Sequence, residues 1–305
     1  MPLLAATLDV EAAEGTVIPD WMGERVRGAL FGLLKAHDAD LATAAHADRA
    51  VQPYTVAWLG PRGEIRPGMR GTLRWTALDP VVADTLATRV LPAIGDTIEL
   101  SGQAWRVTGR GVPTAPPTPV ATDAGADSLG IDTPAVAPVD VPVIMGTVGA
   151  PWAGTATFEA LARAHLVGGR RPPGRVEVAF ATPTTFHSQG RSLPLPLPRL
   201  VFGSLIDRWN AYAPLRIDPE VLAVVEQAVI IGRYELRTEL VPLGGGVQVG
   251  FVGRCGYVLP PGRGIRPADE YAWRVLHLMA AYAFFSGIGA KTTMGMGTAR
   301  GVVGR

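Results

Sequence analysis

The hydrophobic pattern of the first half of the chain predicts alternating strands and helices. The stretch LLAATLDV (3–10) alternates as a half-buried strand does, and Met22, Val26, Leu30 and Leu33 recur at the spacing of one helix face, in a helix beginning near Asp20. The elements expected after it are a short helix at 39–47, strands at 54–59 and 68–78, a helix at 80–91 and a strand at 96–109. This β-α-β-β-α-β order is the ferredoxin-like one.

The second half repeats the same order with clearer signals. A strand at 175–186 precedes two helices, at 198–213 and 218–229, and the glycines at 244–246 join two further strands as a hairpin. In the first of these strands the charged residues alternate with less polar ones, which predicts that one face of the strand is exposed to solvent. The charged residues of this face are Arg233, Glu235, Arg237 and Glu239. A helix capped by Asp269 and ended near Gly287 leads to a last strand at 297–303.

Two stretches rich in Pro and Gly divide the chain. Residues 111–142 show no usable periodicity and predict a long loop or insertion, and a second cluster at 167–175 comes just before a new strand pattern. We therefore expect an α+β protein with tandem ferredoxin-like domains, each an antiparallel sheet with helices on one face. The predicted limits are 1–170, including the insertion at 111–142, and 171–305.

Composition indicates a folded cytoplasmic protein. Of 305 residues, 48% are hydrophobic and 18% charged, which predicts packed cores. The single Cys255 excludes an intrachain disulfide, and the amino terminus lacks the pattern of a signal peptide. The most apolar segment, 271–290, contains Arg274 and His277, so it is expected to be a core helix and not a membrane span.

Charge points to a local rather than a global polyanion-binding surface. The net charge is only +1, but between residues 162 and 201 six arginines stand against the single acid Glu177. These arginines are Arg163, Arg170, Arg171, Arg175, Arg191 and Arg199. The cluster fits a surface for RNA and equally a solvated face, and both interpretations stay open.

The glycine-rich segment SGIGAKTTMGMG (286–297) is not a nucleotide-binding P-loop. The positions at which that motif requires glycine are occupied by Phe285 and Ala290, and the segment closes a helix where a P-loop opens one. Two interpretations remain. The backbone and Lys291 could hold an anionic chain such as RNA, or the glycines could serve a tightly packed turn.

Among the five histidines, His46 has the most suggestive position. It ends a short predicted helix just before a turn and a strand, from which an imidazole can project into a groove. Lys35 and Arg49 are near it in sequence. His37 borders the first helix, and His277 is expected to be packed within the last one.

Four blocks of the sequence resemble one family. SGIGAKTTMGMGTAR (286–300) is similar to the glycine-rich signature G-x-G-x-K-T-x-x-G-x-G of the CRISPR-associated endoribonucleases that process precursor CRISPR RNA, members of the RAMP superfamily. Residues 180–212 resemble that family's central strand and helix, residues 29–59 its first helical pair, and residues 249–259 its hairpin strand. The resemblance touches about two-thirds of the chain, and residues 111–142 have no counterpart.

The resemblance implies a fold, a reaction and a set of residues. It implies tandem RRM-related domains and metal-independent cleavage of CRISPR repeat RNA, in which a 2′-hydroxyl attacks the adjacent phosphate to leave a 2′,3′-cyclic phosphate and a 5′-hydroxyl. His46 occupies the position of the usual catalytic histidine, with Lys35 or Arg49 as phosphorane-stabilising cations and His37 as a second acid or base. Together with the arginine cluster, the candidate RNA-binding residues are Gly287, Gly289, Lys291, Thr292, Gly295, Gly297, Arg191, Arg170, Arg171 and His187.

No metal, cofactor or membrane is expected, and the candidate partners are repeat RNA and other CRISPR-associated proteins of an effector complex. Two departures from the family matter. Phe31 and Gln52 stand where some relatives have tyrosine and lysine, and a phenylalanine cannot transfer a proton. They keep a second hypothesis open, a non-catalytic repeat-RNA-binding RAMP subunit, beside a third with no RNA partner.

Overall fold

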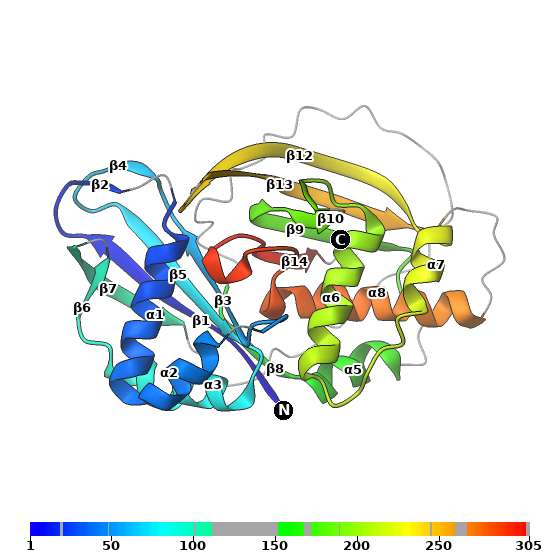
Figure 1. The fold of residues 1–305 in the computed structure, drawn as a ribbon, viewed down its shortest axis with the longest axis horizontal. Coiled ribbons are helices and arrows are strands. Elements are labelled where there is room, and N and C mark those ends of the chain that lie inside the picture. The colour runs from blue at the N-terminus through cyan, green and yellow to red at the C-terminus, as the bar shows by residue number, and fades with distance from the viewer. Residues whose placement is uncertain are drawn as a thin grey trace, which may run out of the picture.

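The computed structural model describes most of the chain as two lobes that lie side by side (Figure 1). The described residues are 1–18, 21–47, 49–100, 102–111, 152–167, 172–188, 190–244, 246–259 and 267–302. Nearly all of the insertion predicted at 111–142 falls outside them, as do Arg170 and Arg171. Within these ranges, no helix combines the length and apolar character needed to cross a membrane.

The N-terminal lobe is an antiparallel sheet with helices on one face. Its strands are β1 (Pro2–Ala12), β3 (Tyr54–Leu59), β5 (Arg70–Ala77), β6 (Thr97–Leu100) and β7 (Gln103–Gly111), in the order β3-β5-β1-β7-β6, and β8 (Gly154–Thr157) pairs with the start of β1. The helices are α1 (Gly23–His37), α2 (Ala39–His46), α3 (Pro80–Thr85), a π-helical turn (Leu86–Val90) and α4 (Leu91–Ala93). A separate small sheet joins β2 (Thr16–Ile18) to β4 (Gly63–Ile65).

The C-terminal lobe has the same topology. Its sheet runs β12-β13-β9-β14, formed by β9 (Arg175–Thr184), β12 (Ile230–Leu243), β13 (Gly246–Val258) and β14 (Ala299–Val302). Around it lie α5 (Phe158–Leu166), α6 (Pro198–Tyr212), α7 (Val221–Ala228), α8 (Pro267–Ser286), the hairpin β10 (Phe186–Ser188) with β11 (Arg191–Leu193), and a 3-10 turn (Thr292–Met294). In both lobes the main strands are ordered second, third, first, fourth, so the predicted tandem ferredoxin-like fold is confirmed.

Strand β1 contributes to two cores. Its residues Leu4, Ala6 and Leu8 pack with α1 in the core of the N-terminal lobe, whereas Leu3 and Ala5, on the opposite face, belong to the core around α8. Alternating side chains of a strand point to opposite faces, so the first sheet is apolar on both sides where α8 covers it. Phe158 and Ala162 of α5, a helix that the sequence pattern did not reveal, pack in the same α8 core. The domain limit near residue 170 stays a prediction.

Two arginines bind the carbonyls at the end of α8. Arg74 of β5, only 1% exposed, donates from Nε to the Trp152 carbonyl at 2.9 Å and from Nη2 to the Phe284 carbonyl. Arg208 of α6 donates to the carbonyls of Ser286 at 3.3 Å and Gly289 at 2.7 Å. Cations suit a helix C-terminus, where unpaired carbonyls concentrate negative charge.

The Arg74 guanidinium also lies between two aromatic rings. Its Cζ is 4.7 Å from the ring centroid of Phe284 and 5.5 Å from that of Trp152, and the Cζ of Arg300 lies 4.6 Å from the Trp152 ring. Burial lowers the pKa of Arg74 to about 9, which still leaves the group charged at neutral pH. Arg74 therefore ties β5 of one lobe to the helix that precedes the glycine-rich segment of the other.

Replacing Arg74 tests whether this arginine stabilises the contact between the two lobes. Arg74→Met should lower the free energy of unfolding by about 3 kcal/mol, because the carbonyls of Trp152 and Phe284 lose their buried donor. The control, Arg70→Met on the same strand, removes a side chain that is 76% exposed and should change it by less than about 1 kcal/mol. Chemical denaturation followed by circular dichroism measures both, and equal effects would contradict the assignment.

Candidate active site

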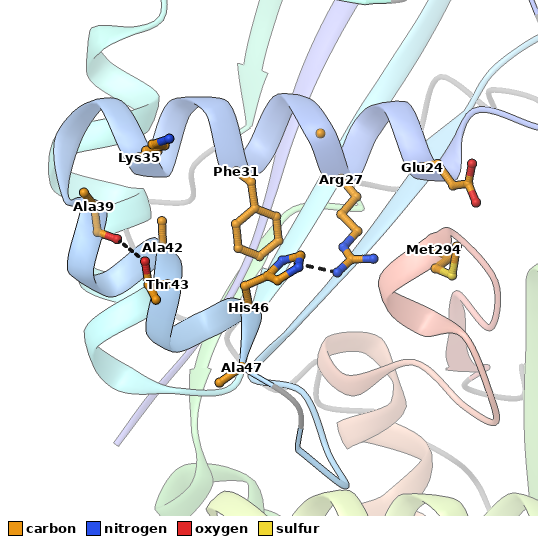
Figure 2. A pocket seen from close by; sticks show the side chains of 11 residues that line it. Glu24, Arg27, Phe31, Lys35, Ala39, Ala42, Thr43, His46, Ala47 and Met294 are labelled. Atoms are coloured by element: carbon orange, nitrogen blue, oxygen red, sulfur yellow. Dashed lines mark hydrogen bonds between the residues drawn. The ribbon is translucent and has the colours of Figure 1, made fainter. Parts of the chain in front are cut away.

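The first two helices form the walls of an open cleft. Helix α1 ends at His37, and the side chain of Asp38 accepts a hydrogen bond from the Leu41 N–H at 2.9 Å to begin α2. The cleft between the two helices has a volume of about 700 Å³. Its lining is Glu24, Arg27, Gly28, Phe31, Lys35, Ala39, Ala42, Thr43, His46, Ala47 and Met294 (Figure 2).

Helical periodicity gathers this lining on one face of α1. Arg27, Phe31 and Lys35 follow one another at four-residue spacing, so their side chains lie on the same side. Val26 and Leu30 lie toward the buried core of the lobe. The face of α1 that lines the cleft therefore carries basic and aromatic side chains.

His46, the last residue of α2, lies against this face (Figure 2). Its ring meets Phe31 edge to face, with ring centroids 5.0 Å apart, and its Nδ1 is 3.3 Å from Nη2 of Arg27. Arginine has only donors, so Nδ1 accepts and the ring proton lies on Nε2 in this arrangement. The imidazole is exposed, which leaves it accessible to a ligand in the cleft.

Arg27 is held by more than His46. Its Cζ lies 5.8 Å from the Phe31 ring centroid, and its guanidinium interacts with the hydroxyl of Tyr54 on β3. Burial raises the pKa of Tyr54, while the charge of Arg27 and the side chain of Thr293 act in the opposite direction. Thr293 belongs to the glycine-rich segment, so this segment reaches the histidine cleft through Tyr54 and Arg27.

The glycine-rich segment touches α1 backbone to backbone. Nε1 of Trp21 donates to the Met294 carbonyl at 2.6 Å. A Cβ built on Gly23 would lie 1.8 Å from that same carbonyl oxygen, and one on Gly295 would lie 2.8 Å from the Gly23 Cα. Only glycine at both positions allows this approach, which places Met294 at the edge of the cleft.

Within the segment, the glycines and Thr292 are buried. Gly287, Gly289, Gly295 and Gly297 all have positive φ, and a Cβ on Gly289 or Gly297 would lie 2.3 or 2.1 Å from the carbonyl oxygen of Thr185 or Ile288. Tight packing therefore accounts for these glycines. Lys291 differs from them because it is exposed, with a left-handed backbone at φ 58°.

The other predicted residues are distributed more widely than their sequence positions suggested. Lys35 lines the cleft with His46, whereas His37 does not, and its carbonyl accepts from Arg89 Nη2 at 2.6 Å. Arg49 is exposed and interacts with the hydroxyl of Tyr212 on α6, outside the cleft lining. His187 and Arg191 are exposed on the β10–β11 hairpin, and Arg170 and Arg171 lie outside the described residues.

Arg27 is the cleft residue that the sequence analysis missed. A single arginine on a helix resembles any solvated charge, but Arg27 lies one turn before Phe31, a position already marked by the family resemblance. Its distance to His46 depends on the angle between α1 and α2, which sequence spacing does not give. Gln52, the other marked position, donates from Nε2 to the Ala47 carbonyl at 3.0 Å.

Comparisons with known proteins agree with this architecture. A family model described as CRISPR-associated endoribonuclease Cas6 matches residues 178–299. The CRISPR-associated endoribonucleases Cas6 of two Mycobacterium tuberculosis strains are 32% identical over 132 residues, an alignment that covers 43% of this chain. The same alignment spans only 40% of the length of these curated relatives.

Solved structures extend the likeness to nearly the whole chain. A Thermus thermophilus Cas6 in a product complex is 27% identical with a TM-score of 0.71, and a further Cas6 in a substrate mimic complex is 27% identical with a TM-score of 0.65. Each match covers 99% of this chain and 100% of the other.

The fold thus belongs to the class of tandem ferredoxin-like proteins, with a glycine-rich segment between the last helix and the last strand. The resemblance to the CRISPR-associated endoribonucleases named Cas6 is confirmed, by sequence over residues 178–299 and by fold over nearly the whole chain.

Proposed function

We propose that this protein is a metal-independent endoribonuclease that cleaves precursor CRISPR RNA within its repeats. The observation that carries the proposal is the contact between His46 and Arg27 in an open cleft that also contains Lys35. A proton-transferring imidazole next to a fixed cation is a combination that can catalyse the cleavage of a phosphodiester. The likeness to Cas6 proteins, two of them solved with a product or a substrate mimic, supports RNA as the substrate.

The proposed reaction is an internal transesterification. The 2′-hydroxyl beside the scissile phosphate loses its proton to a base, and its oxygen forms a bond to phosphorus while the bond from phosphorus to the 5′-oxygen breaks. The leaving oxygen takes up a proton. The products are a 2′,3′-cyclic phosphate on one fragment and a 5′-hydroxyl on the other, with no water consumed.

His46 is the proposed proton-transfer residue. When a phosphate enters the cleft, the Arg27 guanidinium can donate to a phosphate oxygen in place of Nδ1 of His46. The Nδ1 atom of the imidazole is then free to act as a base. Phe31 orients the ring edge to face and takes no part in proton transfer. General acid or base catalysis of this kind contributes roughly 10²–10⁴-fold.

Arg27 and Lys35 are the proposed cations for the phosphorane. Arg27 is already held by Tyr54 and Phe31, so it loses little freedom when it binds the developing negative charge. Lys35 lines the same cleft two helical turns further along α1 and can bind a neighbouring phosphate. Arg27 thus takes the position next to His46 for which the sequence suggested Arg49, and we place neither Arg49 nor His37 in the chemical step.

The rival function is RNA binding without cleavage, and the observation that favours it is Phe31 inside the cleft. Where some relatives carry a phenolic hydroxyl at this position, this cleft has an aromatic ring that cannot donate a proton. Under this alternative, the protein holds repeat RNA as a subunit of a CRISPR ribonucleoprotein.

Cleavage of cognate repeat RNA in EDTA separates the two functions. The wild-type protein should yield a fragment ending in a 2′,3′-cyclic phosphate, His46→Ala should be slower by at least about 10²-fold, and Arg27→Ala by about 10²-fold. Arg25→Ala, an exposed arginine of α1 outside the cleft lining, should cleave at the wild-type rate. Unchanged cleavage by His46→Ala would contradict the mechanism, and tight binding without cleavage would favour the rival.

Lys291 gives a separate test of the RNA-binding role of the glycine-rich segment. Lys291→Gly keeps the left-handed backbone and removes one exposed charge, so the slope of log affinity against log salt for a 2′-deoxy repeat should fall by about 0.7. The control Arg66→Ala removes an exposed charge between β4 and β5 and should leave the slope unchanged. A wild-type slope in Lys291→Gly would show that this lysine does not bind the RNA backbone.

A further inference from the structure

Strand β12 is a long edge of the C-terminal sheet. It pairs with β13 alone, and in the described part of the chain no strand lies beyond it (Figure 1). Most of its 14 residues are exposed or half-buried, including Tyr234 at 68% and Leu240 at 67%. An exposed edge presents unpaired N–H and C=O groups that can pair with another strand.

The charges along this edge alternate in sign. Arg233, Glu235, Arg237 and Glu239 share one face of β12, since side chains two residues apart point the same way. Arg237 and Glu239 form an ion pair at 2.8 Å, and Arg62 approaches Glu239 at 3.4 Å. Within the described residues, Arg233 and Glu235 form no ion pair, so both are available to an external charge.

The alternation is self-complementary in one antiparallel register. With a two-fold axis at Leu236, Arg233 lies opposite Glu239 of the partner subunit and Glu235 lies opposite Arg237 of the partner subunit. Moving the axis by one residue brings like charges together: an axis at Glu235 faces that carboxylate with its own copy, and an axis at Arg237 does the same with the guanidinium. An axis at Tyr234 or Thr238 pairs only two of the four charges of each strand with opposite charges, so the charge pattern favours the register about Leu236, in which all four are paired.

We propose that two copies of this chain associate through antiparallel pairing of β12 about Leu236. The pairing joins the two four-stranded sheets into one continuous sheet across the two-fold axis. It rests on the edge geometry and on charge complementarity, and it does not depend on the proposed endoribonuclease activity.

The other residues of β12 are compatible with this antiparallel pairing. On the opposite face, Tyr234 lies across from Thr238 of the partner subunit. Pro242 has no N–H and an irregularity falls between Ile231 and Arg233, so these features end the pairing on both sides. An edge of this length buries less area than a standard interface, and we expect a dissociation constant in the micromolar range.

Reciprocal charge reversal tests the register. In Glu235→Arg alone or Arg237→Glu alone, a dimer paired about Leu236 places like charges opposite each other, so each variant should sediment as a monomer at concentrations where the wild type is dimeric. An equimolar mixture of the two variants restores opposite charges at all four pairs and should sediment as a dimer. The control Arg199→Glu reverses an exposed charge on α6 and should leave the dimer intact.

Sedimentation velocity of the RNA-free protein over a range of concentrations measures these states. A wild type that stays monomeric at about 100 µM would overturn the proposal, because a micromolar dimer is saturated there. Dimers that persist in both single variants would also overturn it and assign the contact to another surface or another register. A monomeric wild type whose β12 variants lose RNA affinity would instead assign this edge to RNA.

Discussion

The site depends on one close contact between the lobes, where the glycine-rich segment meets the start of α1. The carbonyl of Met294 lies so near Gly23 that any side chain there would overlap it, and Trp21 fixes the same carbonyl with a hydrogen bond. This contact joins Trp21 to Met294, which are 273 positions apart in the chain, and places Met294 at the edge of the cleft. Without it, the helix pair that carries His46 would have no wall on the side of the C-terminal lobe.

Other features of the structure hold that contact in place. Arg74 and Arg208 bind the last carbonyls of α8 from two lobes and so fix the point at which the glycine-rich segment begins. At its far side, Thr293 interacts with the Tyr54 hydroxyl, which in turn interacts with Arg27. A continuous set of contacts thus links the interior between the lobes to the guanidinium beside His46.

The sequence predicted the order of strands and helices because strand alternation, helical spacing and glycine turns are local signals. It also placed His46 at the end of a short helix and the glycine-rich segment between the last helix and the last strand, as observed. Helix α5 and strand β8 were missed because they are short and follow the long Pro- and Ala-rich stretch.

Positions of side chains in the cleft could be predicted less well. Arg49 follows His46 closely in sequence, yet the chain turns away after α2 and the hydroxyl of Tyr212 donates to the Val51 carbonyl at 2.7 Å, which carries Arg49 toward α6. Arg27 reaches His46 only through the angle between two helices. Tertiary packing sets the positions of both arginines, and the spacing of residues along the chain does not predict that packing.

Exchanging Gly23 for alanine tests the central claim most directly. The added methyl group must displace the Met294 carbonyl, so single-turnover cleavage of repeat RNA by Gly23→Ala should fall by at least about tenfold while His46 and Arg27 are unchanged in sequence. Gly32→Ala, on the same helix with open space around it, should cleave at the wild-type rate. Wild-type cleavage by a folded Gly23→Ala variant would contradict the dependence of the site on this contact.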